Sequence, residues 1–337
     1  MKKNNQAISD SIRTSELKIV VIGGGHGLSS ILRGLKKISR NITAVVTVAD
    51  DGGSSGALRR DLGVLPPGDI RNCLTALSDD EEFLSQVLQY RFSSESSVGG
   101  HNLGNLLLTA LANITGSFEQ GIQELTRILA IRGKVTPSTL EDVNLIAEIE
   151  VEENGMPEII KVFGESNISH KNGTIRSLSI EPENVIANPE AIKAILAADI
   201  IALGPGSLYT SVIPNLIVKG ISQALKAAHG KKIYICNVST QPGETTNYTS
   251  LDHVRAIQRA IPDVDLDGVI CNNNHNADKV QNVSWVKIES SMLDNYHVFQ
   301  LDLVDTNYPW RHDSNKVARA LLNAYEELVS AGITKII

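Results

Sequence analysis

The residues best suited to chemistry lie in glycine-rich turns, and the first turn follows a short apolar run. Residues 23–28 read Gly-Gly-Gly-His-Gly-Leu, between the β-branched run 17–22 and an apolar repeat at helical spacing. Glycine tolerates positive φ and leaves backbone N–H groups open to a ligand, and a helix N-terminus attracts anions. The turn therefore suits a diphosphate. It is neither a dinucleotide fingerprint, because Leu28 replaces the last Gly or Ala, nor a Walker A loop; a tight turn without a ligand is the alternative.

A second glycine-rich turn follows the next apolar run, residues 42–48. It contains Asp50, Asp51, Gly52, Gly53 and Ser54. In a doubly wound sheet this turn lies at the same carboxyl edge as the first. Two adjacent carboxylates can accept hydrogen bonds from a ribose, coordinate a divalent ion or act as a base. A single Asp-Gly turn is usually just solvated, but two glycine-rich turns after consecutive strands favour a ligand site.

Two expected helix starts add polar side chains. Pro-Pro-Gly-Asp-Ile-Arg-Asn at 66–72 makes Asp69 either an N-cap or a ligand-binding residue. Arg71 is expected to pair with Asp69 or Asp50, or to reach a phosphate. Gly-Gly-His-Asn-Leu-Gly-Asn at 99–105 precedes another helix, which makes His101 a better site candidate than an isolated histidine.

The second half of the chain repeats this arrangement. Gly-Pro-Gly-Ser-Leu at 204–208, Gln-Pro-Gly-Glu-Thr at 241–245 and three asparagines at 272–274 each follow an apolar run. Loops are often polar, so it is their convergence on one edge of a sheet that predicts a site. The sequence contains no nucleophile motif and no zinc-ligand spacing, so we assign no catalytic residue.

These turns need a doubly wound α/β domain to bring them together. Strand, helix and strand within residues 17–48 form a βαβ unit, and further strands are expected at 199–203, 232–236 and 267–271. Helices are expected at 216–228, 253–261 and 316–330. Short alternating runs between 135 and 188, separated by Asn-Gly and Pro turns, predict a β-rich insertion.

Composition and charge exclude several classes of protein. The 337 residues carry a net charge of −7, which argues against an extended basic face for nucleic acid or an anionic membrane surface. The three cysteines share no CxxC spacing, which favours a reducing compartment. No run is long enough to span a membrane, and the polar residues 1–16 predict a flexible tail without a signal peptide. We therefore expect a cytoplasmic protein.

The order of the motifs resembles that of a known family over nearly the whole chain. Gly-Gly-Gly-x-Gly-Leu, Val-Ala-Asp-Asp-Gly-Gly-Ser-Ser-Gly, Pro-Pro-Gly-Asp-Ile-Arg-Asn, Gly-His-x-Leu-Gly-Asn-Leu-Leu, Gly-Pro-Gly-Ser-Leu-Tyr-Thr-Ser and Thr-Gln-Pro-Gly-Glu-Thr follow one another. They resemble the gluconeogenesis factor family (YvcK type), among the CofD-like proteins named for 2-phospho-L-lactate transferase. The resemblance implies a Rossmann-like three-layer α/β sandwich with a mainly parallel sheet, as one domain over 17–337 with the β-rich insertion at about 135–188.

The resemblance also implies a ligand and a role. The ligand would be a UDP-sugar, UDP-glucose or UDP-N-acetylglucosamine, and the role a cytoplasmic regulator needed for cell shape and wall synthesis during gluconeogenic growth. Cell-wall synthesis proteins are the expected partners, and a homo-oligomer the expected state. By motif, the first turn would contact the phosphates and the other motifs would line the cleft. The predicted site is Gly24, Gly25, His26, Gly27, Leu28, Asp50, Asp51, Gly52, Gly53, Ser54, Asp69, Arg71, Asn72, His101, Asn102, Asn105, Gly204, Gly206, Ser207, Leu208 and Arg311.

Two residues depart from the family pattern. His26 stands where the family usually has Thr, and Asn102 where it often has Ser. His26 can still donate a hydrogen bond to phosphate and would make affinity depend on pH near its own pKa. Asn102 keeps a side-chain acceptor suited to an N-cap.

Three functions remain open on the sequence. The first is a regulator that binds a UDP-sugar without turning it over. The second is a transferase acting on a nucleotide-diphosphate-activated substrate, in which Asp50, with Asp51, would bind Mg²⁺ and neutralise the leaving group. The third, an NAD(P)-dependent oxidoreductase, is disfavoured because the fingerprint fails at Leu28.

Overall fold

A seven-stranded, entirely parallel sheet forms the centre of the computed structural model, which describes residues 16–153, 155–275 and 284–334. The first strand, β1 (Ile19–Gly23), has all five residues buried because its β-branched side chains pack on both faces. Across the sheet the order is β10 (Val298–Leu301), β9 (Gly268–Asn272), β8 (Lys231–Ile235), β7 (Ile200–Leu203), β1, β2 (Ile42–Val46) and β3 (Lys134–Pro137).

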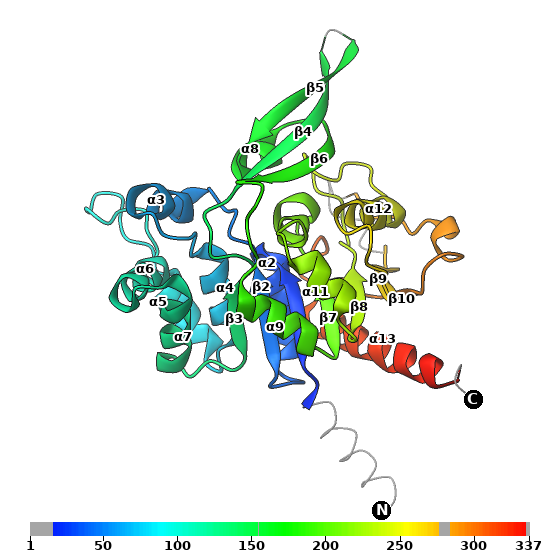
Figure 1. Ribbon diagram of the computed structural model, residues 1–337, viewed down its shortest axis with the longest axis horizontal. Helices are drawn as coiled ribbons and strands as arrows, with labels where there is room; N and C mark the ends of the chain where they lie inside the picture. The colour runs from blue at the N-terminus through cyan, green and yellow to red at the C-terminus, as the bar shows by residue number, and fades with distance from the viewer. Residues whose placement is uncertain (1–15, 154, 276–283, 335–337) are drawn as a thin grey trace, which may run out of the picture.

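Alternate residues of β1 enter two separate hydrophobic cores, one on each face of the sheet. Ile19 and Val21 belong to one core, and Val20 and Ile22 to the other. The first core is covered by α2 (Gly25–Leu35), α4 (Gly68–Leu77), α6 (Leu103–Thr115), α7 (Phe118–Ile128) and α13 (Ser314–Thr334). The second is covered by α9 (Pro189–Ala197), α10 (Ile213–Leu216), α11 (Ile221–Ala227) and α12 (Ser250–Ala260). The predicted three-layer α/β sandwich is therefore confirmed (Figure 1).

The chain changes direction across the sheet between β1 and β7. The connection after β1 enters α2 on one face, whereas the connection after β7 enters a π-helical turn, η1 (Leu208–Val212), and α10 on the other. Ligands of open α/β sheets bind at such a point, beyond the carboxyl ends of the strands. The fold therefore places the glycine turns after β1 (residues 23–28) and after β7 (residues 204–208) side by side.

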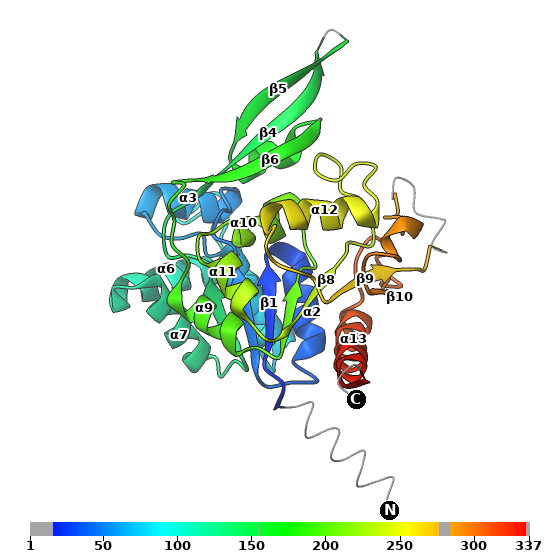
Figure 2. The ribbon, with the colours of Figure 1, turned by 45° about the vertical axis from the view of Figure 1, so that its right-hand side comes forward.

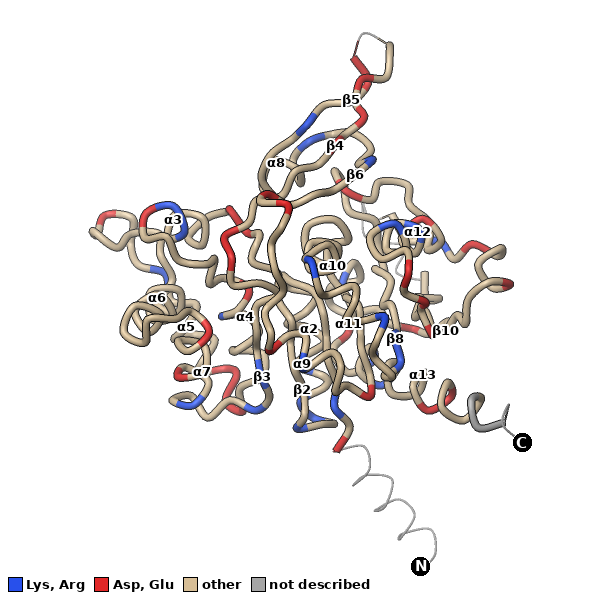
Figure 3. Tube along the Cα trace, viewed as in Figure 1, with Lys and Arg blue, Asp and Glu red and all other residues tan. Residues whose placement is uncertain are grey.

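A small antiparallel sheet stands clear of the main body (Figure 2). Its strands are β4 (Asn144–Glu153), β5 (Met156–Phe163) and β6 (Thr174–Glu181), in the order β5-β4-β6, with α8 (Glu165–His170) between β5 and β6. The β-rich part predicted at 135–188 is present, but β3 at its start belongs to the main sheet. In Figure 3 acidic residues gather at the far end of β4 and β5, where Glu153 pairs with Met156.

Several elements differ from their predicted bounds. The helix expected at 216–228 is divided, because α10 ends at Leu216 and α11 begins at Ile221 after Gly220, whose φ is +105°. The elements that were not predicted individually include α3 (Gly53–Leu62), α5 (Glu81–Gln89), α7, α8, α9 and the edge strand β10. A short 3₁₀ turn, η2 (Ser290–Met292), precedes β10. Across the described ranges, no helix combines the length and apolarity needed to cross a bilayer.

Candidate functional site

A cleft of about 790 Å³ opens at the carboxyl edge of the sheet. Its floor comes from the turns after β1 and β7, one wall from the loop after β8, and another from the segment that leads into α13. The insertion contributes the remaining wall through α8. The described lining residues are Gly24, Gly25, His26, Gly27, Ser30, Arg33, Glu165, Ser169, Gly206, Ser207, Thr210, Ser211, Asn237, Val238, Ser239, Thr240, Gln241, Pro242, Glu244, Asp305, Tyr308, Trp310, Arg311, His312 and Ser314.

The first glycine turn packs directly against the glycine turn after β7, residues 204–208. A Cβ on Gly27 would lie 2.6 Å from Pro205 O and 2.7 Å from Gly206 Cα, so only glycine allows this approach. Gly25 has a φ of +60° and begins α2, whose first N–H groups have no partner within the helix. Gly25 N itself donates to Asp69, so the two turns present their other main-chain donors, with the positive end of the α2 dipole, to the cleft.

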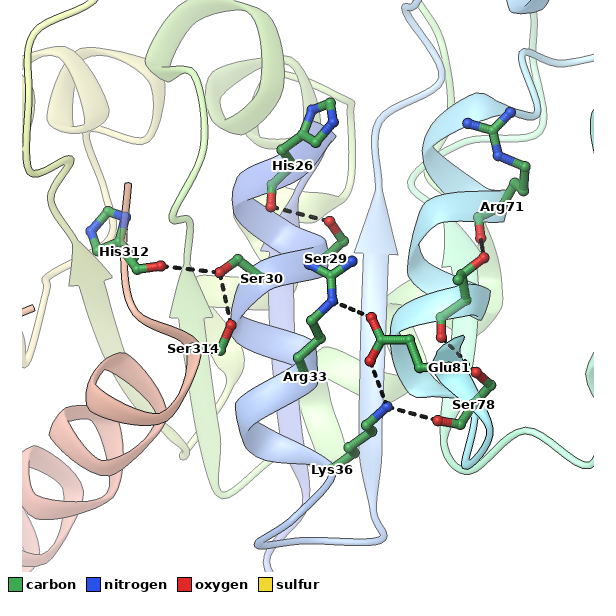
Figure 4. A network of polar contacts seen from close by, with 11 residues as sticks. His26, Ser29, Ser30, Arg33, Lys36, Arg71, Ser78, Glu81, His312 and Ser314 are labelled. Carbon is green, nitrogen blue, oxygen red and sulfur yellow. Dashed lines mark hydrogen bonds and ion pairs between the residues drawn. The ribbon is translucent and has the colours of Figure 1, made fainter. Parts of the chain in front are cut away.

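His26 lies at the N-terminal end of α2, above Arg33 on the same helix (Figure 4). Burial lowers the pKa of His26, and the charges of Arg311, Arg33 and Arg71 lower it further. Any pH effect of His26 on anion binding is therefore expected below its ordinary value of 6.5. A neutral imidazole still has one N–H to donate to a phosphate oxygen.

The turn after β7 is fixed by its neighbours. Gln241 Nε2 donates to Ser207 Oγ at 2.8 Å, which joins this turn to the loop after β8. Glu244 accepts hydrogen bonds from Tyr209 N at 3.1 Å and Thr210 Oγ1 at 2.8 Å. Its side chain is buried, and burial raises its pKa. The sequence motif at 241–245 therefore supports the cleft.

Asp69 does not cap its helix. The N-cap of α4 is Pro67, and Asp69 lies inside the first turn, where its Oδ2 accepts a hydrogen bond from Gly25 N at 2.7 Å. Burial, with the charge of Asp50 and against the hydrogen bond from Gly25 N, raises the pKa of Asp69 to about 6. Of the two roles predicted for Asp69, the N-cap role is wrong; instead, the carboxyl lies against the first glycine turn.

The two adjacent carboxylates of the second turn have separate roles. Asp50 Oδ1 accepts a hydrogen bond from Gly52 N at 2.9 Å, and burial raises the pKa of Asp50. Asp51 Oδ1 accepts hydrogen bonds from Ser166 N at 3.0 Å and Ser166 Oγ at 2.7 Å. Asp51 therefore anchors the first turn of α8, which fixes the insertion to the main domain.

Glu165 was missed on the sequence, although it lines the cleft from α8. Burial, together with the charges of Asp50, Asp69, Asp51 and Glu244, raises its pKa to about 9. Glu165 is therefore protonated at neutral pH. No sequence signal pointed to it, because it lies in the insertion, far along the chain from every glycine motif.

A second polar cluster lies beside the cleft. Arg71 donates to Asn105 Oδ1 at 2.8 Å and to Asn72 Oδ1 at 2.9 Å. Ser54 Oγ is 3.0 Å from His101 Nδ1 and accepts from Asn105 Nδ2 at 3.0 Å. Arg71 was predicted to pair with an aspartate, but its guanidinium donates to two asparagine side chains instead. Among the described residues that line the cleft, none belongs to this cluster.

Three predicted residues do not present their side chains to the cleft. Leu28 and Leu208 are fully buried, one in each core, so they can offer only main-chain groups. Asn102 is the N-cap of α6, but its side chain makes no capping hydrogen bond; its Nδ2 donates to Gln89 O at 3.1 Å instead. The expectation that its acceptor caps the helix is wrong, because the amide ties α6 to the end of α5.

Other predicted residues divide between the cleft and its rim. Arg311 lines the cleft, as expected from the resemblance, whereas Gly52, Gly53 and Gly204 are not among its described lining residues. Tyr308, Trp310 and His312, close to Arg311, also line the cleft but were not predicted. The usable sequence signal was a tryptophan, one of two in the chain, directly before the candidate Arg311. In the structure Trp310 is 41% exposed.

The carboxylates do not form a preformed metal site. Within the described ranges, no group of three or more His, Cys, Asp or Glu is placed to hold a metal ion. Mg²⁺ is often held by one or two carboxylates together with substrate phosphates, and Asp50 with Asp69 can supply that number. The role of Asp50 as a metal ligand stays a prediction.

Comparisons with known proteins identify the family. The family model described as 2-phospho-L-lactate transferase CofD matches residues 19–327. The gluconeogenesis factor of Bacillus subtilis (strain 168) is 43% identical over 321 residues, which cover 92% of this chain and 98% of that protein. The chain belongs to the gluconeogenesis factor family of CofD-like proteins.

Two further relatives agree with this assignment. A family member from Nostoc sp. (strain PCC 7120) is 47% identical over 319 residues, which cover 91% of this chain and 68% of that protein. A crystal structure of a UPF0052 family protein from Bacillus halodurans matches with a TM-score of 0.83 and 41% identity, covering 91% of this chain and 98% of that one. The resemblance predicted from the motifs is confirmed, and so is the fold.

Proposed function

We propose that the cleft binds a nucleotide sugar, a UDP-sugar such as UDP-glucose or UDP-N-acetylglucosamine, and that this binding regulates the protein without turnover. The observation that carries the proposal is the packing of the glycine turns after β1 and β7 at the N-terminus of α2, inside one cleft. Several main-chain N–H groups that converge at a helix N-terminus suit a diphosphate. A volume of about 790 Å³ falls within the range of small-molecule sites.

The charges of the cleft support an elongated anionic ligand. Arg311 and Arg33 line the cleft and both act on His26, and Arg33 is also ion-paired with Glu81. Glu165 and Glu244, which also line the cleft, carry carboxyls with raised pKa values, which reduces the repulsion an anion would meet there. A ligand with a diphosphate in its middle and polar groups at both ends suits this distribution.

The biological part of the proposal follows the family. Relatives over 90% or more of this chain are named gluconeogenesis factors. We propose a cytoplasmic regulator of cell shape and wall synthesis during gluconeogenic growth, acting on wall-synthesis proteins as a homo-oligomer. The ligand would report the supply of activated sugar to those partners.

A thermal-shift and calorimetric titration tests ligand binding. Free ligand at about 100 times its dissociation constant stabilises the folded state by about 2.7 kcal/mol, so UDP-N-acetylglucosamine or UDP-glucose should raise Tm by a few degrees. Arg311→Ala should weaken binding at least about fivefold, as expected for loss of a charge-assisted contact. Arg319→Ala, on the exposed side of α13, is the matched control and should bind as wild type. Wild-type protein that responds to no UDP-sugar refutes the proposal.

A transferase is the second candidate, favoured by the matched family description and by Asp50 and Asp69 beside the first glycine turn. In that reaction an acceptor hydroxyl would attack the activated phosphorus, and a nucleotide would leave with the electron pair of the broken P–O bond. Mg²⁺, held through Asp50, would neutralise the leaving phosphate. Product formation that requires Mg²⁺ and is lost in Asp50→Asn would favour this candidate over the regulator.

A further inference from the structure

One wall of the cleft carries two exposed aromatic rings beside a cation. Tyr308 is 51% exposed and Trp310 41% exposed, with ring centroids 5.7 Å apart in an edge-to-face arrangement. The Arg311 guanidinium lies 5.5 Å from the centroid of the Tyr308 ring. All three residues line the cleft. Such a group binds a flat nucleobase well, because stacking on the aromatic rings adds to apolar contact.

The aromatic wall, defined as Tyr308, Trp310 and Arg311, is held in place by hydrogen bonds. Asp305 Oδ1 accepts from Tyr308 N at 3.0 Å, and Asp305 N donates to Arg311 O at 3.0 Å. Ser239 Oγ donates to Trp310 O at 3.2 Å, which joins the wall to the loop after β8. A wall fixed in this way loses little conformational entropy when a ligand stacks on it.

The segment after the wall is fixed to α2. Ser30 Oγ donates to His312 O at 3.3 Å and lies 3.1 Å from Ser314 Oγ. His312 Nε2 donates to Cys236 O at 3.1 Å, and burial lowers the pKa of His312 to about 4, so its ring stays neutral. The aromatic wall therefore keeps a fixed position relative to the first glycine turn.

The carboxyls lie on the other side of α2. Figure 4 shows His312 on one side of α2 and Arg71, on α4, on the opposite side. Asp69 is on α4 two residues before Arg71, and Glu165 is subject to the charges of Asp50, Asp69, Asp51 and Glu244. The cleft is therefore polarised. The aromatic rings and Arg311 lie at one end, where Asp305 holds the wall, and the carboxyls of Glu165 and Glu244 lie at the other, with the first glycine turn between them.

We infer that the bound nucleotide sugar has one orientation, with its nucleobase on Trp310 and Tyr308, its diphosphate at the glycine turns, and its sugar hydroxyls against Glu165. This inference rests on the proposed function. Sugar hydroxyls are donors and acceptors, so carboxyl groups at that end match them, whereas a nucleobase offers a π face to an aromatic ring. Trp310 then determines affinity for the nucleotide, and Glu165 selects the sugar.

Tryptophan fluorescence tests the position of the base. The chain has two tryptophans, Trp285 and Trp310, so Trp285→Phe leaves Trp310 as the single emitter. UDP should quench this emission, whereas pyrophosphate, which lacks a base, should not. Trp310→Ala should weaken UDP and UDP-N-acetylglucosamine alike, by about 5- to 150-fold, the range for loss of one stacked base. Phe83→Ala removes an aromatic ring that is 61% exposed on α5, outside the cleft lining, and is the matched control.

A second variant tests the position of the sugar. Glu165→Gln should change the ratio of UDP-N-acetylglucosamine affinity to UDP affinity by at least about threefold and leave the UDP affinity itself unchanged, as the loss of one polar contact requires. If Trp310→Ala leaves UDP affinity unchanged, or Glu165→Gln weakens UDP and the UDP-sugar equally, the orientation is wrong although the proposed function stands. If wild-type protein binds neither UDP nor a UDP-sugar, the proposed function itself fails.

Discussion

Replacing Glu165 by glutamine is expected to stabilise the folded protein, because the wild-type carboxyl is held in surroundings that oppose its charge. In the unfolded chain this side chain has its ordinary pKa of 4.5, whereas burial and four neighbouring carboxylates raise the folded-state pKa to about 9. At pH 7 the pH lies about 2.5 units above the unfolded-state pKa of 4.5. At about 1.4 kcal/mol per unit, the charged carboxyl therefore lowers the free energy of unfolding by at most about 3.4 kcal/mol. Glu165 is half-buried rather than enclosed, so solvent screening reduces the expected gain to about 1–2 kcal/mol.

The dependence on pH identifies the cause. Since the folded-state pKa is raised, the carboxyl costs no stability below pH 4.5 and costs progressively more as the pH rises towards about 9. Urea unfolding of wild type and Glu165→Gln at pH 5, 6, 7 and 8 should therefore show a difference in the free energy of unfolding that increases with pH. Glu95→Gln, at an exposed loop position before α6, is the control and should follow wild type at every pH. A difference that is absent, or constant from pH 5 to 8, would refute the reasoning.

Three further substitutions test the packing around the cleft. Gly27→Ala places a Cβ 2.6 Å from Pro205 O and should cost about 1–3 kcal/mol in urea unfolding, whereas Gly23→Ala, whose Cβ meets no heavy atom nearer than 3.7 Å, should be tolerated. Asp51→Ala removes both hydrogen bonds to the first turn of α8, so it should cost about 1–3 kcal/mol and speed proteolysis between β4 and β6; unchanged proteolysis would contradict the anchoring role. Leu32→Ala, in a fully buried position on α2, should lower the free energy of unfolding by about 2–5 kcal/mol, and a loss below about 1 kcal/mol would show that this core relaxes around the cavity.

The main elements of the fold were predictable because their patterns are local. The β-branched run that becomes β1 and the apolar repeat that becomes α2 each bury their apolar side chains where the spacing indicates. Elements with weaker patterns were not predicted individually: β10 has four residues at the sheet edge, and α5 has a single buried residue. Helix boundaries near glycine were also inaccurate, since the predicted helix 216–228 ran across Gly220, whose positive φ precedes the start of α11.

The site was predictable only as far as main-chain turns determine it. The glycine motifs indicated Gly27 and Gly206, which the fold brings into contact. The roles of Asp69 and Asp51 were not predictable, because each depends on a partner far along the chain, Gly25 N and Ser166. Glu165 was missed for the same reason: its place in the cleft follows from the anchoring of α8.

The anchored insertion also determines how a small movement would spread. Gly164 N, at the start of α8, donates to Leu145 O at the base of β4, while the far end of that strand projects into solvent. A ten-residue strand is about 33 Å long at about 3.3 Å per residue, so a rotation of about 5° at its base displaces its far end by about 3 Å. Sub-ångström movements of α8 around a ligand would therefore displace the acidic far end of β4 and β5 by several times that distance.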